Sequence, residues 1–82
     1  MNLLTPAAPL DVSTPGVSVV ALAGGRWRVT SRQGAMLGHL EVVDTEAGQA
    51  FRAMRFSVRE RGFRMLGEFR TATAATDALR FG

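Results

Sequence analysis

The sequence predicts an α+β fold in which an antiparallel β-meander of three to five strands packs on one short C-terminal helix. Residues 26–32, RWRVTSR, alternate between basic or polar and apolar side chains, as a strand with one buried face does. After Arg70 the spacing of the apolar residues changes to a helical repeat. The 82 residues suffice for one small domain.

The sequence predicts that residues 1–16 form a flexible leader and that residues 17–82 form a single domain. Pro6, Pro9 and Pro15 interrupt any periodicity in this segment. It has no basic region and no long apolar core, so we expect neither a signal peptide nor a membrane segment. Because the chain has no cysteine, a cytoplasmic protein without disulfides is expected.

Short β-branched and alternating runs, separated by glycine-containing turns, predict the strands. The predicted strands are residues 17–23, 26–32, 35–44, 50–59 and 63–70. Gly24-Gly25 and Gln33-Gly34 supply tight turns. In the third strand Met36, Leu40 and Val42 are expected on one face, opposite His39 and Glu41.

The fourth strand breaks strict alternation. Phe51 and Ala53 share one parity, whereas Met54, Phe56 and Val58 share the other. Either both faces of this strand are partly covered, or a bulge lies near Ala53 and Met54.

The helix is predicted to begin after Arg70, with Thr71 or Thr73 as its N-cap. Its apolar stripe is expected at Ala74, Ala75, Ala78 and Leu79, with Asp77 facing away. The predicted core residues are Trp27, Leu40, Phe56, Leu66, Phe69 and Leu79.

The charge favours an anionic partner. All ten basic residues are arginine, and residues 26–70 hold nine of them against five acids. Arginines at strand spacing can contact phosphates or make bidentate contacts to guanine in the major groove. The candidate nucleic-acid-binding residues are Arg26, Arg28, Arg32, Arg52, Arg55 and Arg64. The alternative is a solvated face on which arginines pair with Glu41, Glu60 and Glu68.

The second half of the chain resembles a known family of DNA-binding domains. The resemblance is carried by Phe51-Arg52-Ala53, Leu66-Gly67-Glu68-Phe69, Thr71, Ala74-Ala75 and Ala78-Leu79. This array, within residues 34–80, resembles the Apetala/ethylene-response-factor domain and the arm-binding domains of tyrosine-recombinase integrases. The resemblance implies a three-stranded sheet on a C-terminal helix, with the sheet in the major groove of duplex DNA. The helix here is shorter than the family's, and strands at 17–32 precede the matched region.

Catalysis and metal binding are not expected. The chain has no Lys, Cys or Tyr, and its four serines have no recognisable base motif beside them. His39 is the only histidine, which leaves too few donors for a metal site. We therefore expect no enzyme activity, no cofactor and no metal.

A second function from a different class stays open. Residues 17–23 contain neither Lys nor Pro to protect an exposed strand edge, so this strand can pair with another chain. The expected interface residues are Val17, Val19 and Ala21. The sequence thus predicts either a duplex-DNA-binding module or a protein-interaction module, such as a homodimer, and the two can coexist.

Overall fold

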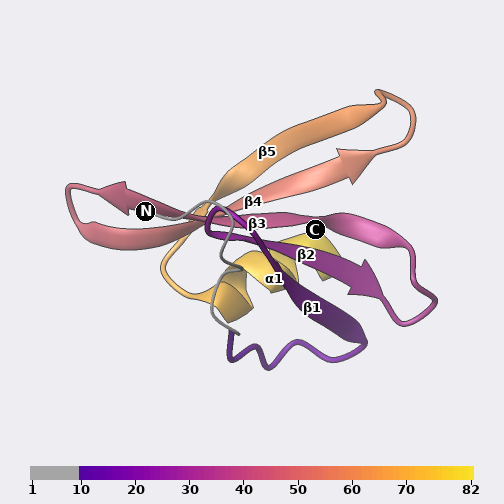
Figure 1. Ribbon diagram of the computed structural model, residues 1–82, viewed down its shortest axis with the longest axis horizontal. Helices are drawn as coiled ribbons and strands as arrows, with labels where there is room; N and C mark the ends of the chain where they lie inside the picture. Colours follow the sequence, from indigo (N-terminus) through magenta and orange to yellow (C-terminus); the bar gives the residue numbers. More distant parts are fainter. Residues whose placement is uncertain (1–9) are drawn as a thin grey trace.

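The computed structural model describes residues 10–82, which form one five-stranded sheet and one helix (Figure 1). The elements are β1 (Val17–Leu22), β2 (Arg26–Ser31), β3 (Met36–Thr45), β4 (Gly48–Ser57), β5 (Gly62–Phe69) and α1 (Ala72–Phe81). The strands follow one another in sequence order, and each neighbouring pair is antiparallel. The predicted α+β meander with one C-terminal helix is confirmed.

Glycines close the hairpins. Gly24 and Gly25, between β1 and β2, have φ of 77° and 71°. Both values lie in the left-handed region, which glycine adopts readily. The double glycine therefore turns the chain as predicted, without the steric cost that a side chain would add.

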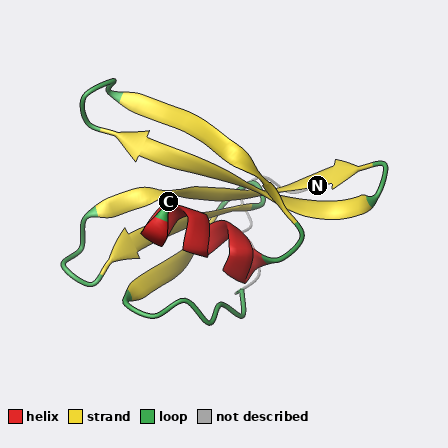
Figure 2. Ribbon diagram, turned by 180° about the vertical axis from the view of Figure 1, so that it is seen from behind, coloured by secondary structure: helices red, strands yellow, loops and turns green. Residues whose placement is uncertain are grey.

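Helix α1 covers one face of the sheet, as Figure 2 shows from the helix side. Thr71 is the N-cap, and its hydroxyl oxygen accepts a hydrogen bond of 3.1 Å from the Ala74 amide. The buried helix residues are Ala72, Ala75, Thr76 and Leu79. This stripe is rotated slightly from the predicted one, because Ala74 and Ala78 are only partly buried.

The core lies between this helix stripe and the sheet. Its buried members are Trp27, Val29, Leu40, Ala53, Ala75 and Leu79. Leu66 and Phe69 pack against this cluster and stay partly exposed. Trp27, Leu40 and Leu79 are thus core residues as predicted. Phe56 is not, because its position in β4 shares a parity with Arg52 rather than with the buried Ala53, so its side chain projects from the other face.

Two register shifts change which residues share a face. Between β4 and β5, Ala53 pairs with Gly67 but Met54 pairs with Met65, which leaves Leu66 as the extra residue. The predicted irregularity near Ala53 and Met54 is present, and the inserted residue belongs to β5.

The second shift lies between β2 and β3. Val29 pairs with Gly38 but Thr30 pairs with Met36, so Leu37 is the extra residue. Met36 therefore shares a face with Thr30, and the prediction that it lies with Leu40 and Val42 is wrong. An inserted residue reverses the alternation, which residue types alone did not indicate.

Part of the predicted leader docks on the helix. The Thr14 hydroxyl donates a 2.6 Å hydrogen bond to the Asp77 carboxylate, and the Ser13 amide donates to the Thr73 hydroxyl oxygen at 3.2 Å. Thr14 is buried. These contacts fasten the segment before β1 to α1, whereas residues 1–9 of the leader lie outside the described residues.

Gly38 provides a test of the helix–sheet packing. A Cβ atom at this position would lie 2.9 Å from Leu79 Cδ2 and would collide with the Met54 carbonyl group. We expect Gly38→Ala to lower the free energy of unfolding by about 1–3 kcal/mol, the usual cost of overpacking. Urea denaturation measures this change. Gly62→Ala is the matched control, because its nearest contact would be the Glu60 carbonyl oxygen at 3.9 Å. Equal stabilities of the two variants would contradict the packing described here.

Candidate nucleic-acid interface

The sheet face opposite α1 carries the candidate site, and we call it the open face. Trp27, Leu40, Ala53 and Gly67 form a cross-strand row, and the first three of these side chains enter the core on the helix side. Because side chains alternate along each strand, the two neighbouring rows project away from the helix. The first neighbouring row is Arg26, Glu41, Arg52 and Glu68, and the second is Arg28, His39, Met54 and Met65.

Three of the six candidate arginines meet on the open face. Arg26 and Arg28 project from β2 and are exposed, and Arg52 projects from β4 and is half-buried. Strand β3 lies between these two strands, so the three guanidinium groups surround its central part. The basic face predicted for β2 is therefore one part of the open face, which also includes Arg52 of β4.

Two other candidates lie elsewhere on the sheet. Arg55 is paired with Gly38 on the helix side, and its Nη2 donates to the carbonyl oxygens of Ala78 and Leu79 at 3.1 and 3.4 Å. Arg55 thus satisfies carbonyl groups at the end of α1, where a positive charge also complements the helix dipole. Arg64 is paired opposite Arg55, and its Nη1 lies 4.0 Å from the Glu60 carboxylate. Neither belongs to the open face.

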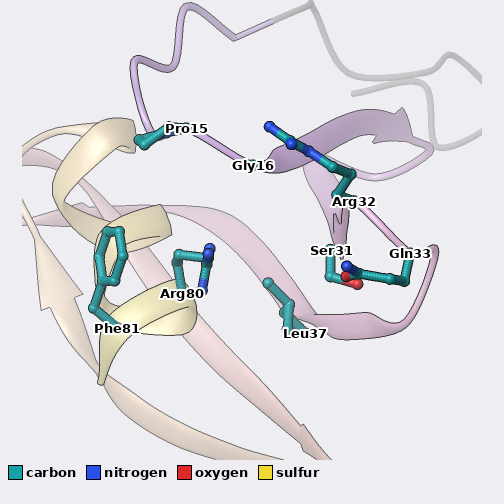
Figure 3. Close-up of a pocket in the computed structure, with 8 residues that line it drawn as sticks. All are labelled: Pro15, Gly16, Ser31, Arg32, Gln33, Leu37, Arg80 and Phe81. Atoms are coloured by element: carbon teal, nitrogen blue, oxygen red, sulfur yellow. The ribbon is translucent and has the colours of Figure 1, made fainter.

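The sixth candidate, Arg32, lines a separate pocket (Figure 3). This pocket has a volume of about 340 Å³ and lies where the leader, the β2–β3 turn and the end of α1 come together. Its lining residues are Pro15, Gly16, Ser31, Arg32, Gln33, Leu37, Arg80 and Phe81. Arg80 lies over the Phe81 ring, 5.1 Å from the ring centroid to the guanidinium carbon. Arg32 is therefore grouped with a helix residue rather than with the arginines of the open face.

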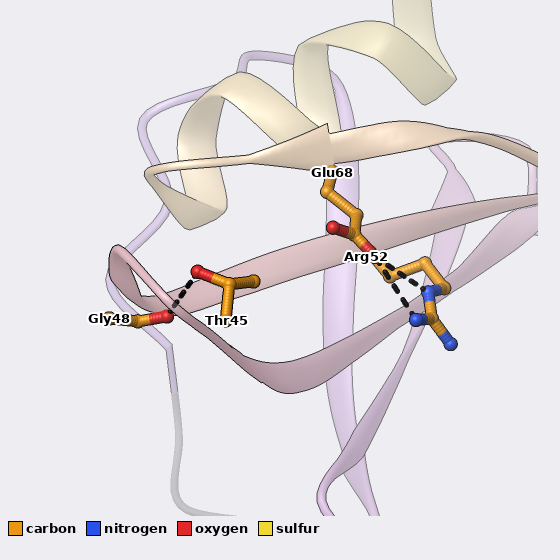
Figure 4. Close-up of polar contacts among 4 residues, drawn as sticks. All are labelled: Thr45, Gly48, Arg52 and Glu68. Carbon is orange, nitrogen blue, oxygen red and sulfur yellow. Dashed lines mark hydrogen bonds and ion pairs between the residues drawn. The ribbon is translucent and has the colours of Figure 1, made fainter.

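Acidic residues alternate with arginines in one row of the open face. Arg52 donates through Nε and Nη2 to one Glu68 oxygen, at 3.3 and 3.0 Å (Figure 4). The two side chains are 36% and 38% exposed. An ion pair this accessible to water contributes at most about 1 kcal/mol, so Arg52 can exchange Glu68 for another anion. This row holds two arginines and two glutamates, and Arg28 of the second row leaves the two rows with one net positive charge.

Aromatic and methionine side chains also lie on the open face, and they were not predicted as a site. The His39 and Phe63 rings stack, with centroids 4.4 Å apart and planes inclined by 20°. Phe56 lies 5.3 Å from Phe63 in a tilted arrangement. We call His39, Phe56 and Phe63, with Met54 and Met65, the aromatic cluster.

A sequence signal for this cluster exists. Met54 and Phe56 share the second parity of β4, and Phe63 and Met65 are two residues apart in β5. Both runs indicate an apolar strip on the face that α1 leaves uncovered. Of the two alternatives raised by the broken alternation of β4, the irregularity near Ala53 and Met54 is present, whereas α1 covers only one face of this strand.

The fold disfavours the charged form of His39, because its surroundings lower the pKa of the imidazole. Burial lowers the pKa of its imidazole below the ordinary 6.5, and the positive charges of Arg26 and Arg28 lower it further, against a smaller opposing effect of Glu41. A neutral imidazole is suited to stacking against Phe63.

The expected interface residues belong to β1, the edge strand opposite β5. Among residues 10–82, β1 is a terminal strand of the sheet and pairs with β2 alone. The side chains of Val17, Val19 and Ala21 are directed toward the core and are partly buried there. Val20 points the other way and is 50% exposed. Any partner of this edge would therefore use the β1 backbone and Val20.

Residues 10–82 hold neither a metal-binding cluster nor a membrane-spanning helix. No group of three or more His, Cys, Asp or Glu side chains there could hold a metal ion. The same residues include no helix that is long and apolar enough to cross a membrane. No family model, curated protein or solved structure matches the chain, so these comparisons do not bear on the resemblance to the Apetala-type and integrase arm-binding domains.

The lowered pKa of His39 predicts a pH dependence of stability. Its pKa is below 6.5 in the folded protein and about 6.5 in the unfolded chain, so the unfolded state takes up the proton first as the pH falls. The contribution of His39 to stability is therefore complete above about pH 6.5 and decreases below it. Between about pH 7.5 and pH 5, the wild type should lose more stability than His39→Gln, as measured by chemical denaturation. Parallel losses in the two proteins would contradict the assigned direction.

Proposed function

We propose that this protein is a non-catalytic nucleic-acid-binding module and that the open face is its contact surface. One observation supports the proposal: the side chains of Arg26, Arg28 and Arg52 lie on the same solvent-facing side of the sheet. Guanidinium groups are suited to phosphates because each presents several N–H donors in a planar fork.

The spacing of these arginines suits an extended phosphate backbone. Arg26 and Arg28 are two residues apart in β2, a separation of about 6.6 Å along the strand. Arg52 lies two strands away from Arg26, or roughly 10 Å across the sheet. The three cations therefore form a triangle that can contact more than one phosphate of the same ligand.

The acids on the open face limit the strength of this attraction. Glu68 must release Arg52 when a phosphate binds, and Glu41 stays beside Arg26. We therefore expect about three phosphate contacts rather than an extended basic groove.

The proposal agrees with the expected DNA-binding role of the sheet. The resemblance to the Apetala-type and integrase arm-binding domains implies a sheet that lies against duplex DNA. Because α1 packs over one side of the sheet, the open face is the side on which three arginines are accessible to a nucleic acid of either form.

Salt dependence and one substitution test the proposed function. With three contacts, the logarithm of the association constant should fall with the logarithm of salt concentration at a slope of about −2 to −3. Arg28→Gln should weaken binding and reduce this slope by roughly one. Fluorescence anisotropy with labelled oligonucleotides, single-stranded and duplex, measures both quantities.

Arg80→Gln is the matched control for this experiment. It removes the same charge from the helix, on the other side of the sheet. Its effect should therefore be small. Equal weakening by Arg28→Gln and Arg80→Gln would show that net charge, and not the open face, is responsible.

A second candidate function is self-association through β1. This strand ends the sheet, contains no Lys or Pro, and exposes half of Val20. Pairing of β1 with its counterpart in a second copy would continue the sheet across a two-fold axis. The open faces of the two copies would then form one larger surface, so a homodimer is compatible with nucleic-acid binding.

Val20→Lys tests the dimer. A lysine at this exposed edge position should prevent strand pairing and leave the fold intact, because the side chain of Val20 does not enter the core. Val19 is unsuitable because its side chain packs against the core. Sedimentation equilibrium should show a dimer for the wild type and for the exposed-turn control Val58→Lys, and a monomer for Val20→Lys. A monomeric wild type at high concentration would rule out this candidate.

A further inference from the structure

The aromatic cluster is not explained by phosphate contacts. Phe63 is 42% exposed and Met65 is 55% exposed, on a strand at the edge of the sheet. Large apolar side chains that gather on one exposed surface are commonly binding surfaces. The three open-face arginines can bind phosphates, but phosphate binding does not account for the exposed rings and methionines beside them.

The cluster presents flat rings close to a positive charge. The near-parallel stack of His39 on Phe63 holds both rings in defined orientations, and Phe56 supports Phe63 from β4. Arg28 is the cross-strand neighbour of His39. A planar, apolar ligand that carries a negative charge would thus find a ring surface and a guanidinium group side by side.

We propose that the aromatic cluster is a base-stacking site and that the preferred ligand of the open face is single-stranded nucleic acid. This inference rests on the proposed function and names the class of nucleic acid. The faces of the bases are hidden in a duplex but accessible in a single strand, where they stack on aromatic side chains while the backbone contacts cations.

The charge of the open face agrees with this choice of ligand. A surface with one net positive charge gains little from the dense phosphates of a duplex, whose binding depends mainly on charge neutralisation. Stacking adds free energy that does not depend on net charge, at about 1–3 kcal/mol per base in known cases. Stacking on the exposed rings would therefore add binding free energy to the limited electrostatic attraction of the three arginines.

Three ligands of equal length test the inference on the wild-type protein. They are a labelled single strand of about 15 nucleotides without self-complementarity, its duplex, and an abasic phosphodiester strand that carries the same charges without bases. We expect the single strand to bind at least about 5-fold more tightly than either of the others. Equal affinity for the single strand and the abasic strand would overturn base stacking, and tighter binding of the duplex would overturn the preference for a single strand.

Matched variants locate the stacking site. Phe63→Leu keeps an apolar side chain but removes the ring, and it should weaken single-strand binding by about 5- to 100-fold without changing abasic binding. Phe63→Tyr should retain the wild-type affinity. Phe81→Leu makes the same change at an exposed phenylalanine on α1 and should leave both affinities unchanged. Thermal unfolding of each variant verifies its fold.

The outcomes separate this inference from the proposed function. If Phe63→Leu and Phe81→Leu behave alike while Arg28→Gln still weakens binding, stacking at the aromatic cluster is overturned and the nucleic-acid interface stands. Failure of all three ligands to bind at tens of micromolar protein would overturn both proposals. If Phe63→Leu instead converts a dimer to a monomer in sedimentation equilibrium, the cluster is an interface between copies, and the stacking proposal fails.

Discussion

The close packing of α1 on one face of the sheet is the constraint on which the rest of the structure depends. Ala72 and Ala75 present small side chains to the sheet, and Leu79 fits against Gly38, where a methyl group would collide. A helix of ten residues can cover one side of a five-stranded sheet and no more. Among residues 10–82 no second helix covers the other side, which carries the side chains that the alternation of the strands places there.

This constraint also divides the arginines by role. Arg55 faces the helix and donates to its last carbonyl groups, so its charge serves the fold. Arg26 and Arg28 face away and are accessible to a partner. The same division applies to the apolar residues, because those of the helix side form the core, whereas the aromatic cluster lies on the open face. The open face thus combines cations and rings, the two kinds of group that nucleic acids contact.

Local patterns predicted the elements well, but contacts between distant residues decided the site. The alternation of residues 26–32 placed Trp27 inside and Arg28 outside, and the change of period after Arg70 located the helix. Either parity of β4 could have faced the helix, because both carry apolar residues, and Phe56 was therefore misplaced in the predicted core. The inserted residues in β3 and β5 and the bonds from Arg55 to α1 depend on strand register, which no single segment encodes.

We propose that the open face, and not the helix side, binds the ligand. Mapping of backbone amide chemical shifts in an NMR titration with a single-stranded oligonucleotide tests it most directly. We expect the largest shifts in β2, β3 and the β4–β5 hairpin, at Arg28, His39 and Phe63, and little change in α1 and in the pocket near Arg80. Shifts concentrated in α1 and around Arg80, or no shifts at a saturating ligand concentration, would contradict it.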